Sequence, residues 1–192
     1  MTTVYVVADN DDQVQFNLLS SGSVHYVLLN DPPGSPVDTD YTENNDEANA
    51  NEELGYPSFA VPAGATINHL CLFMRVSEPL SSAGQARHNY TVNGSRINGT
   101  TRSPSSTLTN YEDLITDNGA TALPWTVDEI NGVDATNPYS DRNGQRALTG
   151  AGEAIRCSQM YSCVDYTPAA AGRPLPQRIL SGPFSGPFGG PF

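Results

Sequence analysis

The chain has 192 residues, of which 38% are hydrophobic and 16% are charged, and its net charge is −12. This length is typical of one large domain, or of one domain with a long arm. Glycine (17 residues) and proline (15 residues) are abundant, which favours short strands joined by turns over a helical bundle. No apolar stretch approaches the ~18 residues that would indicate a membrane-spanning helix, and the first residues lack the pattern of a secretory signal.

The charges are unevenly distributed along the chain. Residues 1–74 hold eleven acidic residues and no basic one, and all nine basic residues of the chain are arginines. An acidic chain of this kind is a poor candidate for nucleic-acid binding, which needs basic side chains to displace counterions. The absence of lysine also excludes Schiff-base and P-loop chemistry. We therefore expect neither a nucleic-acid partner nor a membrane partner.

The first part of the chain predicts short strands separated by turns. Positions 4–7 form a β-rich apolar run, and positions 14–18 alternate between apolar and polar residues, as in a half-buried strand. The acidic run at 9–12 lacks the glycine and the distal glutamate of a calcium-binding loop, so we expect a solvated turn there. The apolar run at 24–29 is interpreted as another strand, ended by a proline-rich turn.

Residues 30–55 are predicted to form a long acidic surface loop. They hold eight acidic residues, no basic residue and almost nothing apolar. Charge runs of this composition are usually solvated. The loop has room for one short edge strand around Tyr41.

The strongest strand signal lies at 67–76, where apolar residues occupy both faces, as in the central strand of a sandwich. The next strand is predicted at 85–97, where Asn93-Gly94 is a strong hairpin-turn signal.

The last part of the domain is more polar. Tyr111 and Leu114 are expected to anchor the Ser/Thr-rich residues 98–124 to the core, and Thr126, followed by acidic residues, predicts one short helical turn. A final strand is predicted at 154–166. We expect its single face to carry Ile155, Cys157, Gln159, Tyr161 and Cys163.

These patterns predict an all-β protein. Residues 1–167 are expected to form one antiparallel β-sandwich of the jelly-roll or immunoglobulin-like kind. Trp125, the only tryptophan, is expected to fill the core between the sheets. No helix longer than about two turns is indicated.

The three cysteines, Cys71, Cys157 and Cys163, form an odd set. A secreted disulfide scaffold would show an even and denser set, and no spacing indicates a zinc site. We interpret the three as small buried hydrophobic residues rather than as redox groups. No metal site and no cofactor are predicted.

No catalytic motif is present in the sequence. His25, His69 and His88 fall in three separate predicted strands, without a carboxylate or nucleophile at a recognisable spacing. Each is interpreted as a structural histidine, and the protein is expected to be non-enzymatic.

The composition changes at residue 168, where a Pro/Gly-rich arm (168–192) begins. Its last twelve residues repeat the unit Ser/Gly-Gly-Pro-Phe three times. Proline at every fourth position excludes a helix or a central strand, and exposed phenylalanines would favour aggregation. A flexible tail is one interpretation; the other is a docking arm. The residues predicted to bind a partner are Phe184, Phe188, Phe192, Leu175, Ile179 and Leu180.

Three segments carry a resemblance to a known class of proteins. They are AVPAGATI at 60–67, which leads into a buried strand, PWTVDEINGV at 124–133, and CVDYTP at 163–168. Their order resembles that of β-sandwich proteins of the virions of tailed bacteriophages, over about residues 56–168. The resemblance implies a head decoration (cement) protein, a tail-fibre module or another minor virion protein, with no catalytic residues to transfer. The arm is not part of the pattern.

The sequence therefore predicts a non-enzymatic virion structural protein. We expect a capsid decoration protein that stabilises the head by bridging neighbouring subunits with its arm. Its expected partners are the major capsid protein or neighbouring copies of itself, as a trimer by analogy. It would be made in the host cytoplasm without a signal peptide and carried on the exterior of the virion.

Two alternatives of other classes remain open. A carbohydrate- or receptor-binding module of a tail fibre would use Tyr41, Tyr111 and Tyr139 on loops, and glycan binding would identify it. A self-assembling filament subunit would insert its arm into the next copy, and fibres formed by the purified chain would identify that one.

Overall fold

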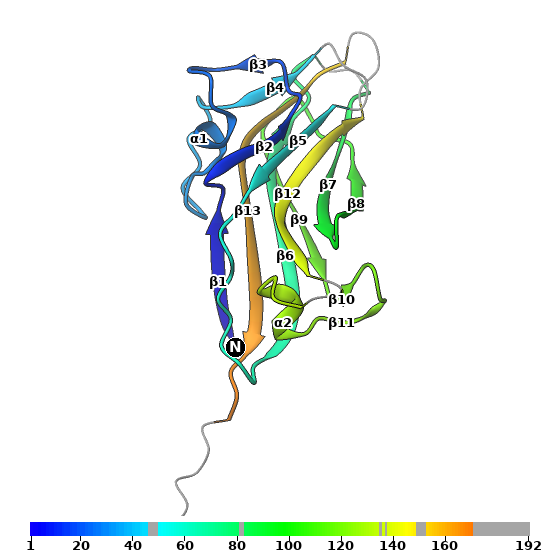
Figure 1. Ribbon diagram of the computed structural model, residues 1–192. Coiled ribbons are helices and arrows are strands. Elements are labelled where there is room, and N and C mark those ends of the chain that lie inside the picture. The colour runs from blue at the N-terminus through cyan, green and yellow to red at the C-terminus, as the bar shows by residue number, and fades with distance from the viewer. Residues whose placement is uncertain (46–49, 81–82, 135, 137, 149–152, 171–192) are drawn as a thin grey trace, which may run out of the picture.

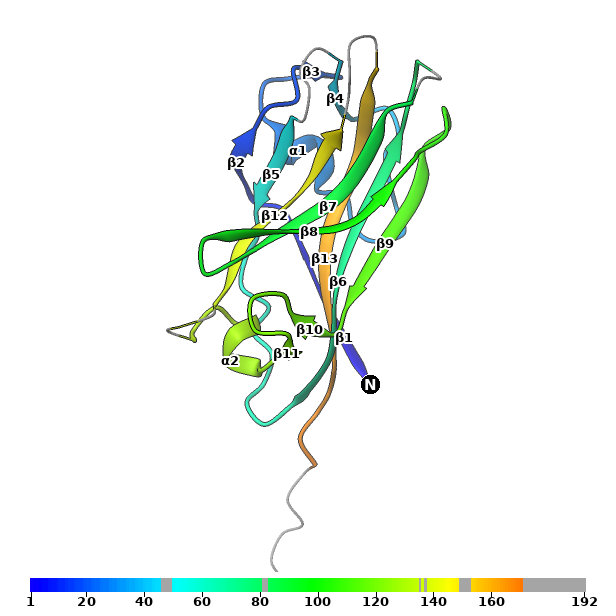
Figure 2. The same cartoon turned by 90° about the vertical axis from the view of Figure 1, so that its right-hand side faces the viewer.

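The structure, a computed structural model, describes residues 1–45, 50–80, 83–134, 136, 138–148 and 153–170, with the backbone alone at 140–148. It confirms the predicted antiparallel β-sandwich. Figures 1 and 2 show an elongated body in which two sheets face each other, with the N-terminus and the end of the last strand at the same lower end. The partner-binding residues predicted in the arm, from Leu175 to Phe192, lie outside the described residues.

Two sheets make up the sandwich, and each of their strand pairs is antiparallel. Sheet A consists of β1 (Thr2–Val7), β3 (Leu18–Leu19), β4 (Thr42–Asn44), β6 (Thr66–Ser77), β9 (Thr109–Ile115) and β13 (Ile155–Thr167). Sheet B consists of β2 (Asn10–Val14), β5 (Asn51–Gly55), β7 (Gln85–Val92), β8 (Ser95–Arg102) and β12 (Tyr139–Leu148). Outside the sheets are the hairpin of β10 (Asp117–Asn118) and β11 (Leu123–Pro124), and the helices α1 (His25–Leu29) and α2 (Val127–Ile130).

The strand order is that of a jelly roll. Sheet A has β1 and β4 on one side of β13, and β6 and β9 on the other, whereas sheet B runs β2-β5-β12-β7-β8. The chain therefore changes sheets at most of its connections. Among the described strands of the two sheets, β3 and β4, separated by α1, and β7 and β8, joined as a hairpin, are the consecutive strands that pair within one sheet. Two interlocked Greek keys of this kind distinguish a jelly roll from an immunoglobulin-like sandwich.

The core lies between the sheets and is centred on β6 and β13. As predicted, β6 is a central strand, between β13 and β9. Leu70, Leu72 and Met74 of β6 are at most 2% exposed, and burying each such side chain contributes roughly 1.5–3 kcal/mol. Trp125 is buried, as predicted, and its Nε1 donates a hydrogen bond to the carbonyl of Ile115.

Two local predictions are confirmed. Asn93 and Gly94 form the tight turn between β7 and β8, with φ values of 47° and 71°, as a two-residue hairpin turn requires. Thr126 caps α2, and its side chain and that of Glu129 each bond the other's backbone N–H, which is a capping box.

The predicted single face of the last strand is wrong. A bulge between Cys157 and Gln159 shifts the register of β13 against β6, and a one-residue shift moves later side chains to the opposite face. Cys157 consequently packs in the core, whereas Tyr161 and Cys163 lie on the outer face of sheet A, opposite Phe73 and Cys71.

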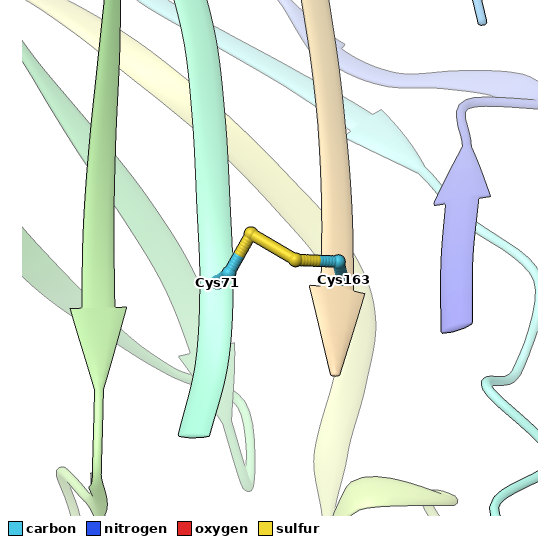
Figure 3. Close-up of a disulfide and its surroundings, with 2 residues drawn as sticks. All are labelled: Cys71 and Cys163. Carbon is cyan, nitrogen blue, oxygen red and sulfur yellow. A yellow bond between two sulfur atoms is a disulfide. The ribbon is translucent and has the colours of Figure 1, made fainter. Parts of the chain in front are cut away.

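The interpretation of the cysteines as small buried hydrophobic residues is right about burial, since all three are at most 5% exposed, but it missed a disulfide. Cys71 of β6 and Cys163 of β13 are directly opposite each other, with Cα atoms 4.9 Å apart, and form a disulfide (Figure 3). The two residues are 92 positions apart, so nothing in their local sequence indicates the pairing. Cys157 alone is a buried free cysteine, as predicted.

The N-terminal segment departs from its predicted elements. Residues 25–29 form a helix instead of a strand, and residues 10–14 form β2 instead of a turn. Residues 10–14 pair with β5, and the carboxylate of Asp11 accepts hydrogen bonds from the backbone N–H groups of His25 and Tyr26, where the helix begins. A carboxylate at the first turn of a helix satisfies its free donors.

The predicted acidic loop 30–55 is wrong in its second half, because the fully buried strand β5 lies there. The short strand predicted around Tyr41 is present as β4, but it lies between β3 and β13 and not at an edge. The acidic residues of β5 are buried because they have distant partners: Glu52 contacts His25, and Glu53 pairs with Arg96. Leu114 is not an anchor either, since it is 57% exposed on β9, whereas Tyr111 packs against the core. The polar strand β12 was not predicted at all.

Within the described part of the chain, no helix is both long enough and apolar enough to cross a membrane.

Candidate functional site

Apolar side chains are grouped on the outer face of sheet A, and we call this group the aromatic face. Tyr5 and Leu114 at its two ends are exposed, whereas Cys71 and Cys163 between them are buried. The strand register places its residues in two rows across β1, β13, β6 and β9. The first row is Val7, Tyr161 and Phe73, ending at Glu112, and the second is Tyr5, Cys163, Cys71 and Leu114.

The rings of the aromatic face contact one another. Phe73 stacks on Tyr161 with ring centroids 4.3 Å apart, and Tyr5 meets Tyr161 edge-on at 5.9 Å. Burial, together with the charge of Glu112, raises the pKa of Tyr161 to about 12, so this phenol stays neutral. Tyr5 is 51% exposed and Leu114 is 57% exposed at the two ends of the second row. Large apolar side chains grouped on a surface in this way mark interaction sites.

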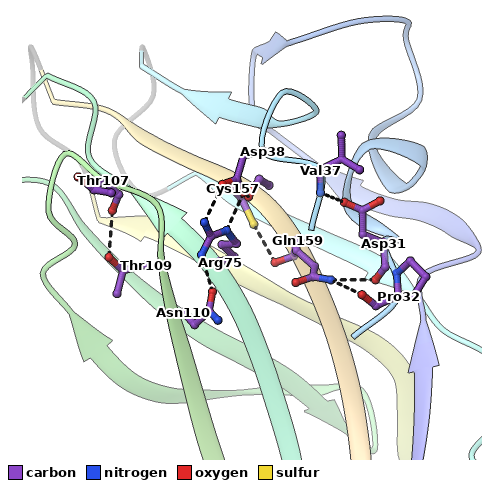
Figure 4. A network of polar contacts seen from close by, with 11 residues as sticks. Asp31, Pro32, Val37, Asp38, Arg75, Thr107, Thr109, Asn110, Cys157 and Gln159 are labelled. Carbon is purple, nitrogen blue, oxygen red and sulfur yellow. Dashed lines mark hydrogen bonds and ion pairs between the residues drawn. The ribbon is translucent and has the colours of Figure 1, made fainter. Parts of the chain in front are cut away.

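The upper half of the same sheet face is covered by the protein's own chain (Figure 4). The Arg75 guanidinium donates to both carboxylate oxygens of Asp38 at 2.6 Å, and Nε2 of Gln159 donates to the carbonyls of Asp31 and Pro32. Arg75 and Gln159 form the row directly above Phe73 and Tyr161. The segment 31–38 therefore covers the polar part of the face and stops where the aromatic part begins.

An exposed carboxylate belongs to the aromatic face. Glu112 ends its first row and is exposed, and its carboxylate lies within 4.8 Å of both sulfur atoms of the disulfide. Asp165 lies one row below the disulfide, opposite His69, and is buried. The face therefore combines apolar side chains with the accessible negative charge of Glu112.

A separate cavity of about 630 Å³ lies between the lower loops of sheet B and α2. Its lining residues are Asp9, Asn10, Tyr56, Pro57, Ser58, Phe59, Asn93, Gly94, Ile130, Asn131, Gly132, Pro138 and Tyr139. Its volume is that of a small-molecule site.

The cavity wall is held by a side chain of α2's cap. Nδ2 of Asn131 donates to the carbonyl of Val61, and its Oδ1 accepts from the N–H of Val61, both at 2.9 Å. Phe59 packs against Tyr139 at 5.8 Å, and Tyr139 packs edge-on against Trp125 at 6.0 Å. The floor is thus aromatic and fixed.

Polar groups surround this floor. Asp9, Asn10 and Asn93 are exposed at the rim, and the Asn10 amide donates to the Asp9 carboxylate at 3.0 Å. An aromatic floor with amides and a carboxylate at the rim matches the hydroxyl groups and apolar faces of a sugar ring.

The structure separates the three tyrosines that the glycan-binding hypothesis grouped together. Tyr139 lines the cavity. The guanidinium carbon of Arg156 lies 4.0 Å from the ring centroid of Tyr41. The guanidinium carbon of Arg102 lies 5.7 Å from the ring centroid of Tyr111. Only Tyr139 therefore contributes to a cavity of suitable size.

His25 and Glu52 form a buried pair between α1 and β5. Nδ1 of His25 lies 2.6 Å from Oε1 of Glu52, and the other Glu52 oxygen accepts from the N–H of Phe16. Burial opposes protonation of His25, but the bond to Glu52 and its charge outweigh it, so the pKa of His25 is raised. Burial also raises the pKa of Glu52, against the effect of His25. The pair fastens α1 to sheet B.

A second polar cluster joins the two sheets at the edge between β8 and β9. Asp113 of β9 is 3.2 Å from Nδ1 of His88 on β7, and it accepts hydrogen bonds from Arg102 and from the N–H of Thr100. Burial acts to raise the pKa of Asp113. The hydrogen bonds and charges of its partners, of which His88 has the largest effect, nevertheless hold this pKa well below its usual value. Gly99 is required here because a Cβ would collide with the Asp113 carboxylate. The cluster is a clamp between the sheets.

Of the potential metal ligands among the described residues, one set of three lies close together: Cys71, Glu112 and Cys163. The two sulfur atoms are bonded to each other, and the thiolate rather than the disulfide is the metal ligand. This set therefore does not offer a metal-binding arrangement.

The chain matches no protein-family model, and a search of curated proteins found no significant match. Its function must therefore be argued from its own surfaces.

The sequence did not identify the aromatic face. The signal was present, since Cys71 and Phe73 are interleaved with the core residues of β6, but apolar residues on both faces of a strand equally fit burial on both sides. Finding the face required the register of β1 and β13 against β6, which the bulge in β13 concealed.

Proposed function

We propose that this protein is a non-enzymatic virion structural protein, and specifically a capsid decoration protein that bridges neighbouring subunits. The observation that carries the proposal is the aromatic face, where Tyr5 and Leu114 are more than half exposed on sheet A, the sheet whose last strand leads into the arm. Two attachment elements on one rigid domain suit a protein that joins subunits.

Other features support this proposal. Jelly rolls recur among viral capsid proteins, which is an analogy of fold alone. The Cys71–Cys163 disulfide suits a protein that works in an oxidising environment, as the exterior of a released particle is. The three short motifs at 60–67, 124–133 and 163–168, with their resemblance to phage virion proteins, point the same way.

The arm supplies reach and avidity. Residues 168–192 would span on the order of 75 Å at ~3.1 Å per residue in an extended, proline-rich conformation, which is enough to reach an adjacent subunit. A second anchor on the same chain multiplies the overall affinity without requiring a strong single contact.

Retention on purified particles tests this function. A chain that ends at Ala169 should fold and fail to bind particles, and Phe184→Ala with Phe188→Ala should weaken retention at both low and high salt. The matched control is Ser181→Ala with Ser185→Ala, which alters the same repeat without removing a ring and should be retained normally. Normal retention of the truncated chain would overturn the proposal. Loss of wild-type retention in moderate salt, with the phenylalanine variant unaffected, would instead identify the acidic segment 30–55 as the attachment surface.

A second candidate function, saccharide binding by a tail-fibre module, is favoured by the cavity at Phe59 and Tyr139. Glycan-array binding with and without calcium would detect it. Asn93→Ala changes an exposed rim amide and should abolish glycan binding if the cavity is the site, whereas Asn98→Ala, an exposed asparagine on β8 outside the cavity, should not. Glycan binding unaffected by Asn93→Ala would exclude the cavity.

A further inference from the structure

We propose that the aromatic face is the receptor for the Gly-Pro-Phe repeat, residues 181–192, of a second copy of this chain. The inference rests on the proposed function and identifies one of its partners. It follows from the composition of the face, the composition of the arm, the direction of the chain and a match of spacing.

The face keeps two large apolar side chains exposed in the described part of the chain. Segment 31–38 covers the row of Arg75 and Gln159, and the two rows below it keep Tyr5 and Leu114 more than half exposed. The Cys71–Cys163 disulfide fixes β6 against β13 in the middle of this surface. A rigid receptor loses little conformational entropy on binding.

The arm has the complementary composition. Residues 168–192 contain three phenylalanines at four-residue intervals, together with Arg173 and Arg178, and no acidic residue. The arm is therefore +2 while the remainder of the chain is −14, within a total of −12. The exposed carboxylate of Glu112 on the face suits an arm that is cationic beside its aromatic repeat.

The direction of the chain favours a second copy over the same copy. β13 runs down the sandwich, and residues 168–170 continue beyond its lower end, away from the body (Figures 1 and 2). An arm that continued in this direction would meet a neighbour, whereas docking on its own face would require it to reverse.

The spacing of the rings fits the width of the face. Four residues in an extended, proline-rich conformation span about 12 Å. The three strand spacings from β1 to β9 span about 14 Å, at roughly 4.8 Å each. Two successive phenylalanines could therefore lie near Tyr5 and Leu114, at opposite ends of one row. Glycine in each repeat allows the backbone to turn both rings towards the sheet.

Sedimentation of the full-length chain over a range of concentrations tests this inference. Three variants are compared with the wild type: Tyr5→Arg with Leu114→Arg on the face, Phe184→Ala with Phe188→Ala in the arm, and Leu123→Arg as a control. Leu123 is 63% exposed on β11, outside the four strands that form the face. Circular dichroism and thermal unfolding show whether each variant is folded.

The wild type and the control are expected to self-associate, and the face and arm variants should each associate at least tenfold more weakly. The decisive measurement is a mixture of the two. The face variant supplies an intact arm and the arm variant an intact face, so the mixture should form 1:1 complexes that neither forms alone.

Three results would overturn the inference. They are a wild type that stays monomeric, a face variant that associates like the wild type, and a mixture that forms no complex. None of these contradicts the proposed function if the arm is still needed for retention on particles, since the arm would then bind the shell. If the arm proves dispensable on particles, the function fails, whatever the mixture shows.

Discussion

The two sheets of the sandwich differ in how their strands are held. Sheet A holds the apolar strands β6 and β13, which are joined by a disulfide. Both sheets bury polar and charged residues, among them Glu43 in sheet A and Glu52 and His88 in sheet B. The covalent link is specific to sheet A, whereas the pair of Glu52 with His25 makes part of the stability at sheet B depend on pH. The outer faces of the two sheets also differ, because the aromatic face lies on sheet A.

Removing the disulfide should have the largest effect and should act through sheet A. Cys71→Ser with Cys163→Ser frees a loop of about 92 residues, and the free energy of unfolding should fall by about 3–5 kcal/mol. Denaturant unfolding with and without a reductant measures it. The reductant should destabilise the wild type and leave the double variant unchanged; an equal effect on both would contradict the disulfide.

Replacing Glu52 tests the dependence of sheet B on charge pairs. Glu52→Gln should lower the free energy of unfolding by roughly 1–3 kcal/mol at pH 6, since it weakens a buried bond to His25. The raised pKa of His25 means that its stabilisation is complete below its usual pKa of 6.5 and is lost as the pH rises through the folded value. The raised pKa of Glu52 likewise makes the folded state less stable as the pH rises.

The difference in the free energy of unfolding between the wild type and Glu52→Gln should therefore become smaller as the pH rises from 6 to 9. Thermal unfolding across this range measures it, with Leu72→Ala in sheet A as the control that should show no such trend. A difference that grows with pH would show that the pair does not stabilise α1 in the way described.

The inter-sheet clamp should respond to pH in the opposite direction. Asp113→Asn should cost roughly 1–3 kcal/mol at pH 7, because it weakens the contacts with His88 and Arg102. The lowered pKa of Asp113 makes its contribution present above the usual value of 3.8 and progressively lost as the pH falls below it. Denaturant unfolding at pH 7 and pH 3 measures the loss of stability that Asp113→Asn causes at each pH. A loss that is unchanged at pH 3 would contradict a stabilising role for the ionised Asp113 carboxylate.

The surface pair above the aromatic face should matter least. Asp38 is well exposed beside Arg75, and Asp38→Asn should change the free energy of unfolding by at most about 1 kcal/mol. The effect should diminish further in high salt, because exposed charges are screened. A larger effect, unchanged by salt, would mean that segment 31–38 is a structural part of sheet A rather than its cover.

An element could be predicted from the sequence where neighbouring residues determine it, and not where distant partners do. β6, the Asn93-Gly94 turn and the capping box of α2 follow from neighbouring residues, and all three were predicted. β5 was interpreted as loop because the partners that bury Glu52 and Glu53 lie 27 and 43 residues away. Polar strands become recognisable only once their distant partners are known.

The candidate site was harder to predict than the fold. The pairing of Cys71 with Cys163 spans 92 positions, and the bulge in β13 reverses the faces of the residues that follow it. A period-2 pattern that starts at Ile155 therefore assigned Tyr161 and Cys163 to the same face as Ile155. The aromatic face emerges only when the registers of four strands are combined.

The most direct test of the arm-and-face account is a cross-link from the arm. The purified chain carries a photoreactive phenylalanine analogue at position 188 and is irradiated, and the cross-linked dimer is digested and mapped by mass spectrometry. The account predicts cross-links between copies to peptides that contain Tyr5, Phe73 or Tyr161, and their loss in the Tyr5→Arg, Leu114→Arg variant. Cross-links confined to one chain, or to the cavity around Tyr139, would contradict it.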